Sequence, residues 1–81
     1  MITPNPGKNK ILFLIESHHD TSVTIEVRDF SGQLIKSFIE RISANSKRTV
    51  AWDIKGKLNQ GVYFATFKTE KQAIIKKVII K

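Results

Sequence analysis

Cysteine is absent from this 81-residue sequence, proline occurs only twice, and no apolar run is long. Without cysteine the chain can form no disulfide and has no thiolate for catalysis or metal binding. The longest apolar run, residues 11–15, falls far short of the roughly 20 residues that a membrane-spanning helix needs. A chain of this length forms one domain at most. Its stability must therefore come from apolar packing in one thin core.

Acidic residues are also scarce, with 7 Asp and Glu against 14 Lys and Arg and a formal net charge of +7. Such an excess can indicate binding to nucleic acid. However, the basic residues are spread along the chain and do not alternate with aromatic residues as in RNA-binding sheets. They gather only near the end, at Lys76, Lys77 and Lys81. We therefore expect a well-solvated basic surface and no nucleic-acid partner.

Apolar residues recur at every second position, which is the period of a half-buried strand. Residues 23–27, 50–54 and 63–67 follow this pattern, and residues 74–80 form a last apolar strand. Residues 33–42 also fit a helical face, but their β-branched and aromatic side chains favour a strand. The sequence thus predicts an all-β fold, a small antiparallel β-sandwich of six to seven strands with no helix. The inward positions predict one core between the sheets: Val23, Ile25, Val27, Val50, Trp52, Tyr63 and Phe67.

Turn residues separate these strands. In residues 29–32, Asp29 can accept backbone N–H bonds and Gly32 can supply a positive φ. Asn45 is expected to adopt the left-handed conformation in the next turn. A hairpin tip is expected at residues 70–71, before the last strand.

No constellation for catalysis, cofactor binding or metal binding stands out. The only two histidines, His18 and His19, lie beside Asp20, and adjacent residues of a strand point to opposite faces. Trp52 and Tyr63 would suit a carbohydrate platform, but both fall at inward positions, which favours a role in the core. No acid/base couple and no Gly-rich phosphate loop is present. We expect no enzyme activity, no cofactor and no metal.

Several short motifs occur in a specific order along the chain. Pro-Asn-Pro at residues 4–6 precedes the first predicted strand, and Val-Arg-Asp at residues 27–29 precedes Gly32. Gly-Val-Tyr-Phe at residues 61–64 is followed by a Lys-Lys-Val-Ile-Ile-Lys ending at residues 76–81. In this order and at these distances, the motifs resemble the C-terminal sorting domain of type IX secretion system cargo proteins in the Bacteroidetes. The resemblance covers nearly the whole chain.

The resemblance implies an immunoglobulin-like sandwich that acts as an address tag rather than as an enzyme. Such a domain stands at the C-terminus of a longer secreted protein, so residues 1–6 would end a linker and residues 7–81 would form the sorting domain. The tag is exported to the periplasm and directs its protein to the outer membrane, the cell surface or the medium. The partners implied are the translocon, the shuttle and the sortase-like peptidase of the secretion machinery.

The resemblance also implies which residues matter. The recognition residues would be Gly61, Tyr63, Lys76, Lys77, Val78, Ile80 and Lys81. The boundary and turn residues would be Pro4, Asn5, Pro6, Asp29 and Gly32. We expect the last strand to be a sheet edge that could accept a further strand, from the machinery or from a second copy in a homodimer. The alternative function is a retained immunoglobulin-like interaction or signalling module that binds an envelope protein.

Overall fold

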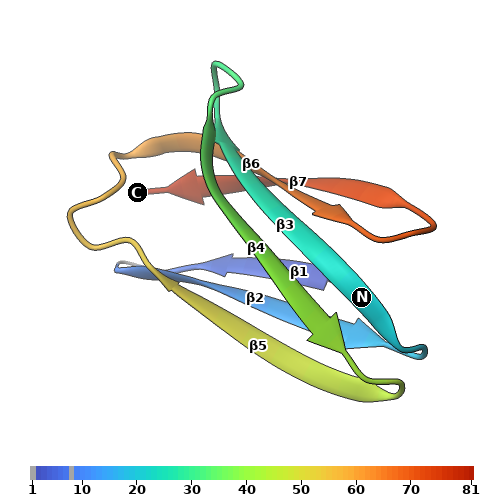
Figure 1. Cartoon of the computed structure of the whole chain (residues 1–81). Helices are drawn as coiled ribbons and strands as arrows, with labels where there is room; N and C mark the ends of the chain where they lie inside the picture. Colours follow the sequence, from blue (N-terminus) through green and yellow to red (C-terminus); the bar gives the residue numbers. More distant parts are fainter. Residues whose placement is uncertain (1, 8) are drawn as a thin grey trace.

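The computed structural model describes the backbone of residues 2–7 and 9–81 and the side chains of residues 7 and 9–81. This part of the chain contains seven strands and no helix (Figure 1). The strands are β1 (Ile2–Pro6), β2 (Lys10–Ser17), β3 (Thr21–Asp29), β4 (Leu34–Ile42), β5 (Ser46–Asp53), β6 (Gly61–Lys68) and β7 (Ala73–Ile80). The segment that also fitted a helical pattern is strand β4, so the prediction of an all-β chain is confirmed.

The strands form two antiparallel sheets that face each other (Figure 1). One sheet has three strands in the order β1-β2-β5, and the other has four in the order β4-β3-β6-β7. The chain changes sheet after β2, after β4 and after β5, while β3–β4 and β6–β7 are hairpins within the larger sheet. This is a small immunoglobulin-like β-sandwich, as the sequence predicted.

The core lies between the sheets and is built from the inward residues of both. All seven residues predicted for the core are buried, with exposed fractions of 7 % or less. Phe13 of β2 lies at its centre, because its ring is wholly buried and its centroid is 5.8 Å from that of Phe67 on β6. Phe38 of β4 packs on the other side, 6.1 Å from Phe13 and 5.9 Å from Trp52. Aromatic rings therefore join strands of both sheets.

Residues 2–6 depart from expectation. We expected the two prolines to mark an unpaired linker, but Ile2–Pro6 form strand β1 and pair with β2, with Pro4 opposite Phe13 and Pro6 opposite Ile11. Proline is tolerated in this position because β1 is at the edge of its sheet, where only one side of the strand is hydrogen-bonded. The segment is thus part of the folded sheet. Where the domain begins in a longer chain stays a prediction.

The turns follow the predicted chemistry. The Asp29 Oδ1 atom accepts hydrogen bonds from the Ser31 backbone N–H at 2.9 Å, the Ser31 hydroxyl at 2.6 Å and the Gln33 backbone N–H at 3.0 Å. Gly32 has a φ of 92° in this turn, which favours glycine. Asn45 has a φ of 57°, as expected for the left-handed residue of the β4–β5 turn.

Tyr63 fixes the loop that enters β6. Its side chain is only 7 % exposed, and its hydroxyl donates a hydrogen bond of 2.8 Å to the carbonyl oxygen of Asn59. A tyrosine near the start of this strand that bonds back to the upstream backbone is the tyrosine corner of immunoglobulin-like sandwiches. The bond ties the loop after β5 to the start of β6.

Removing the Trp52 side chain should strongly lower the stability of the domain. We expect Trp52→Ala to lower the free energy of unfolding by about 3–5 kcal/mol, because it leaves a cavity beside Phe38. Denaturant unfolding followed by circular dichroism measures the change. Leu14→Ala is the control, because Leu14 is 43 % exposed and should change stability by less than about 1 kcal/mol. Equal effects of the two substitutions would contradict the assigned core.

The tyrosine corner makes a second prediction. Tyr63→Phe keeps the ring in the core but removes the hydrogen bond to Asn59. We expect the free energy of unfolding to fall by roughly 0.5–1.5 kcal/mol, the usual net contribution of one such bond. The same unfolding experiment measures it, and a variant as stable as the parent would show that the bond does not stabilise the fold.

The Asp29 turn should make stability depend on pH. The hydrogen bond from the Ser31 hydroxyl, together with those from the backbone, lowers the pKa of the Asp29 carboxyl from its ordinary value. A carboxyl of this kind stabilises the fold above its unfolded pKa of about 4, and that stability is lost as the pH falls through the lower folded-state pKa. We expect the Tm of the parent to fall more steeply than that of Asp29→Asn between about pH 5 and pH 2. Parallel profiles would contradict the role of this carboxylate.

Candidate recognition site

The β6–β7 hairpin brings together the two motifs that the sequence analysis singled out. In the antiparallel register, Gly61 lies opposite Ile80, Tyr63 opposite Val78, and Ala65 opposite Lys76. The Gly-Val-Tyr-Phe segment and the Lys-rich ending are therefore neighbours on adjacent strands (Figure 1). All of the expected recognition residues lie on this hairpin or directly after it.

These residues divide by the direction of their side chains. Tyr63, Val78 and Ile80 point inward and are 7 %, 2 % and 6 % exposed, so their side chains belong to the core. Gly61 is half-buried at the start of β6, and its φ of 154° is one that L side chains rarely adopt. In the folded domain the side chains of Tyr63, Val78 and Ile80 thus pack in the core, and Gly61 begins the hairpin.

The three lysines are exposed, each for a different reason. Lys77 points away from the core on the outer surface of the sheet, opposite Phe64. Lys76 has the inward phase, yet it is exposed because β7 is an edge strand. Lys81 follows the last residue of β7. Three exposed cations thus lie along β7 and directly after it.

Strand β7 is the edge of the four-stranded sheet, as expected. Strand β1 is the edge of the other sheet and lies close to β7 along the same side of the sandwich (Figure 1). A strand that added to β7 would therefore run beside β1 as well. The N-terminal segment that we expected to be a linker is in this way a neighbour of the expected recognition strand.

The sequence analysis missed an apolar surface on the outside of the four-stranded sheet. Among the described side chains, eight large apolar ones are exposed, and seven of these belong to this sheet or to its β3–β4 turn. Six lie at outward positions of the strands and form what we call the outer apolar face: Leu34, Ile39, Val62, Phe64, Ile75 and Ile79. The signal was present, because β6 and β7 are apolar at both phases of the alternation. The outward apolar residues were missed because only the inward positions were used to predict the function of each strand.

Three charged side chains of β3 and β6 form ion pairs on this same side of the sheet. Glu26 of β3 accepts from the Lys68 Nζ atom at 2.8 Å, and the Arg28 Nη2 atom lies 3.9 Å from the same carboxylate. The hydrogen bond from Lys68, followed by the charges of Lys68 and Arg28, lowers the pKa of Glu26 from its ordinary value. The Arg28 Nη1 atom also donates to the carbonyl oxygen of Gly32 at 3.0 Å. The negative charge of the Glu26 carboxylate is thus balanced by Lys68 and Arg28 within the sheet.

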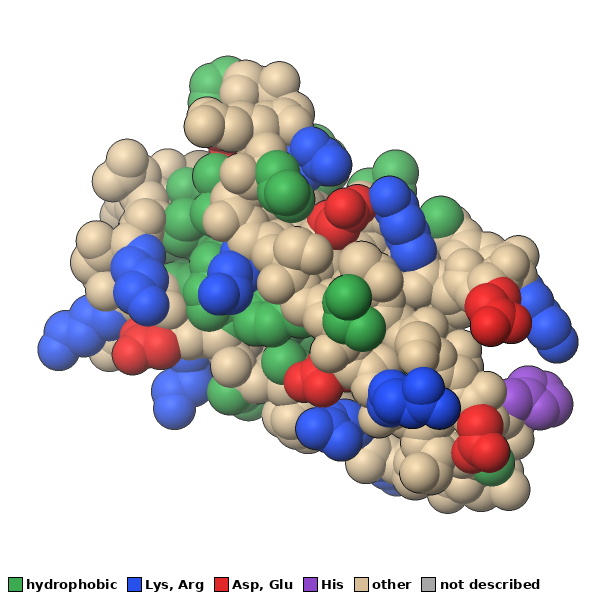
Figure 2. Space-filling model, in the orientation of Figure 1, with side chains coloured by type: hydrophobic (Ala, Val, Ile, Leu, Met, Phe, Trp, Pro, Cys, Tyr) green, Lys and Arg blue, Asp and Glu red, His purple; other side chains and the backbone are tan. Residues whose placement is uncertain are grey.

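Basic side chains are distributed over the face of the molecule that Figure 2 shows, with fewer acidic ones among them. This matches the expectation of a well-solvated basic surface. No helix in the described part of the chain has the length and apolar character to cross a membrane.

The histidine segment serves the turns at the other end of the sandwich. The His18 Nδ1 atom lies 3.4 Å from the Asn45 Oδ1 atom, and the Asp20 Oδ1 atom accepts from the Ala44 N–H at 2.8 Å. No group of three potential metal-ligating His, Asp or Glu side chains occurs among residues 7 and 9–81.

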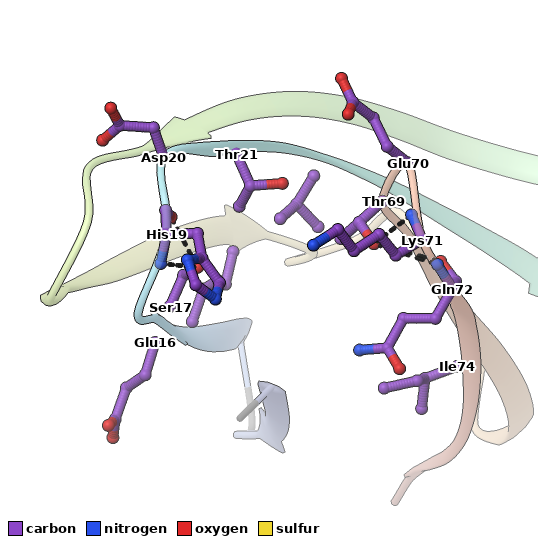
Figure 3. Close-up of a pocket in the computed structure, with 12 residues that line it drawn as sticks. Glu16, Ser17, His19, Asp20, Thr21, Thr69, Glu70, Lys71, Gln72 and Ile74 are labelled. Carbon is purple, nitrogen blue, oxygen red and sulfur yellow. Dashed lines mark hydrogen bonds between the residues drawn. The ribbon is translucent and has the colours of Figure 1, made fainter.

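A cavity of about 600 Å³ opens between this segment and the β6–β7 turn. Figure 3 shows His19 on one side of it and Lys71 with Gln72 on the other. The Ser17 hydroxyl donates to the His19 carbonyl oxygen, and the Thr69 Oγ1 atom accepts from the Lys71 and Gln72 N–H groups. These polar groups hold the two turns, and none of them forms a nucleophile–base pair.

Comparison with known proteins adds the family. Among curated proteins, none matches this sequence. The model of the family described as secretion system C-terminal sorting domain matches residues 1–81, which is the whole chain. The match includes β1, the Asp29 turn and both strands of the hairpin. This protein chain therefore belongs to the family of type IX secretion C-terminal sorting domains.

Proposed function

We propose that this domain is a non-catalytic sorting signal that directs a longer secreted protein across the outer membrane through the type IX secretion system and to the cell surface. The observation that carries this function is the family match over the full length of the chain. The protein would pass through the periplasm and reach the outer membrane, the cell surface or the medium. Its partners would be the translocon, the shuttle and the sortase-like peptidase of the machinery.

The arrangement of β7 suits such a signal. The inward residues Val78 and Ile80 anchor the strand in the core, while Lys77 alternates with them and faces solvent. The buried side of β7 thus fixes the position of the strand, and a partner can contact the lysines on its exposed side. We propose that residues 76–81 carry the sorting information, with Lys77 and Lys81 as the charges that are read.

A reporter fusion tests this function. The domain is fused to the C-terminus of a periplasmic reporter in a host that has the type IX machinery, and surface delivery and the Tm of the domain are measured. We expect Lys77→Glu with Lys81→Glu to reduce delivery while the Tm changes little, because exposed charges contribute only about 0–1 kcal/mol to stability. Val78→Asp should instead unfold the domain, because it buries a charge in the core.

The controls separate recognition from folding. The unmodified fusion in a strain that lacks the machinery should remain in the periplasm. Normal delivery of a folded fusion that lacks residues 76–81 would contradict the assignment of the signal to the end of the chain. Failure of the unmodified fusion to reach the surface would contradict the sorting function itself.

A further inference from the structure

Four members of the outer apolar face form a continuous patch on β6 and β7: Val62, Phe64, Ile75 and Ile79. Leu34 and Ile39 of β4 lie on the other side of β3, whose outward residues are polar or charged. Val62 and Ile79 are cross-strand partners, and Phe64 lies between Arg28 on β3 and Lys77 on β7. Ile75 lies two residues along β7 from Lys77, on the same side of the sheet, and is 67 % exposed. Four strands about 4.8 Å apart and eight residues with a rise of about 3.3 Å give a surface of roughly 19 by 26 Å. A standard protein interface buries about 800 Å² per partner, so it would cover all of this surface, which has a projected area of roughly 500 Å², together with part of its rim.

Folding alone does not account for this surface. An antiparallel sheet that packs on one core usually alternates apolar residues inward with polar residues outward. The three-stranded sheet follows that rule in its described part, because Leu14 is its only exposed large apolar side chain. The four-stranded sheet carries six such side chains on its strands. Contiguous apolar surface of this kind marks an interaction site in a soluble protein.

The charges on this face select the kind of partner. At the outward positions of the four strands, four cations stand against a single carboxylate, Glu26: Arg28, Arg41, Lys68 and Lys77. Lys68 and Arg28 are occupied with Glu26. Arg41 and Lys77 form no ion pair with another described residue, so they remain available to carboxylates of a partner.

We propose that the outer apolar face docks a protein of the secretion machinery whose contact surface is apolar at its centre and acidic around it. This inference deepens the proposed function and rests on it. It places the contact on strands β3, β4, β6 and β7 together, beyond the last six residues of the chain. Apolar burial supplies the affinity, and Arg41 and Lys77 set the orientation of the partner.

Two other occupants fit the observations less well. A second copy docked through the same face would bring like cations together, which costs free energy. A lipid bilayer favours apolar side chains that protrude and insert. Ile39 and Ile75 do protrude, at 72 % and 67 % exposed, but Val62 and Phe64 are only 37 % and 36 % exposed. A cation also stands directly opposite Phe64. A surface with apolar side chains and interspersed cations matches a protein with interspersed carboxylates.

The test uses the reporter fusion with substitutions outside residues 76–81. We expect Ile75→Glu to reduce surface delivery roughly tenfold, because it places a carboxylate within the apolar contact. Arg41→Glu should reduce delivery severalfold. The matched controls lie on the other sheet: Leu14→Glu for the apolar position and Lys47→Glu for the charge. Both controls should be delivered like the parent. Circular dichroism melting of each variant shows that the four domains remain folded.

A photoreactive amino acid at position 75 tests direct contact in the same cells. It should crosslink to one component of the machinery, with a yield that falls in the Arg41→Glu background, whereas the same amino acid at position 14 should give no such product. Parent-like delivery of the folded Ile75→Glu fusion, or equal crosslinking from positions 75 and 14, would overturn the docking site. Flotation of the purified domain with phosphatidylglycerol vesicles that is lost in Ile75→Glu would assign the face to a membrane and overturn a protein partner.

The two proposals fail in different ways. If the unmodified fusion stays in the periplasm, the sorting function is wrong, and docking to the machinery is wrong with it. If the unmodified fusion reaches the surface but Ile75→Glu has no effect, the sorting function stands and only the docking face is wrong.

Discussion

The packing of Phe13 between the two sheets is the contact on which the rest of the structure depends. The chain has no disulfide, so the sheets are held together by apolar side chains and by the connections that cross between them. Phe13 is wholly buried and contacts the rings of Phe67 and Phe38 from the opposite sheet. Those contacts fix the spacing of the sheets, and with it the alternation of inward and outward residues along every strand.

In the β6–β7 hairpin, the residues that are buried in the core therefore determine which residues are exposed on the surface. With Tyr63 and Val78 in the core, their neighbours Phe64 and Lys77 must face solvent. A slip of one residue in this register would bury Lys77 and expose the core residues, at a large cost in free energy. The hydrogen bond from Tyr63 to Asn59 holds the start of the hairpin in this register. The recognition surface is thus set by the same residues that stabilise the fold.

Most of the fold could be predicted from the sequence because its signals are local. The period of two along residues 23–27 and 63–67, Asp29 and Gly32 in one turn, and Asn45 in another each act through neighbouring backbone atoms. Strand β1 was missed because prolines usually end a strand, and only the position at a sheet edge makes them acceptable. The outer apolar face was missed because only the inward phase of each strand was interpreted, although β6 and β7 are apolar at both phases. Which strands lie beside β6 and β7 depends on pairing that the sequence alone does not reveal.

A partner that binds residues 76–81 and a partner that binds the outer apolar face would differ in whether they distinguish a folded from an unfolded domain. Residues 76–81 are contiguous, so a partner that reads only this segment finds the same side chains in a folded and in an unfolded chain. The outer apolar face exists only when β3, β4, β6 and β7 lie side by side, since Ile39 and Ile75 are far apart in the sequence. Docking through this face therefore selects the folded domain, and each loss of core stability lowers the population that the partner can bind. Under the proposed docking, the thin core of this domain makes recognition a check on folding.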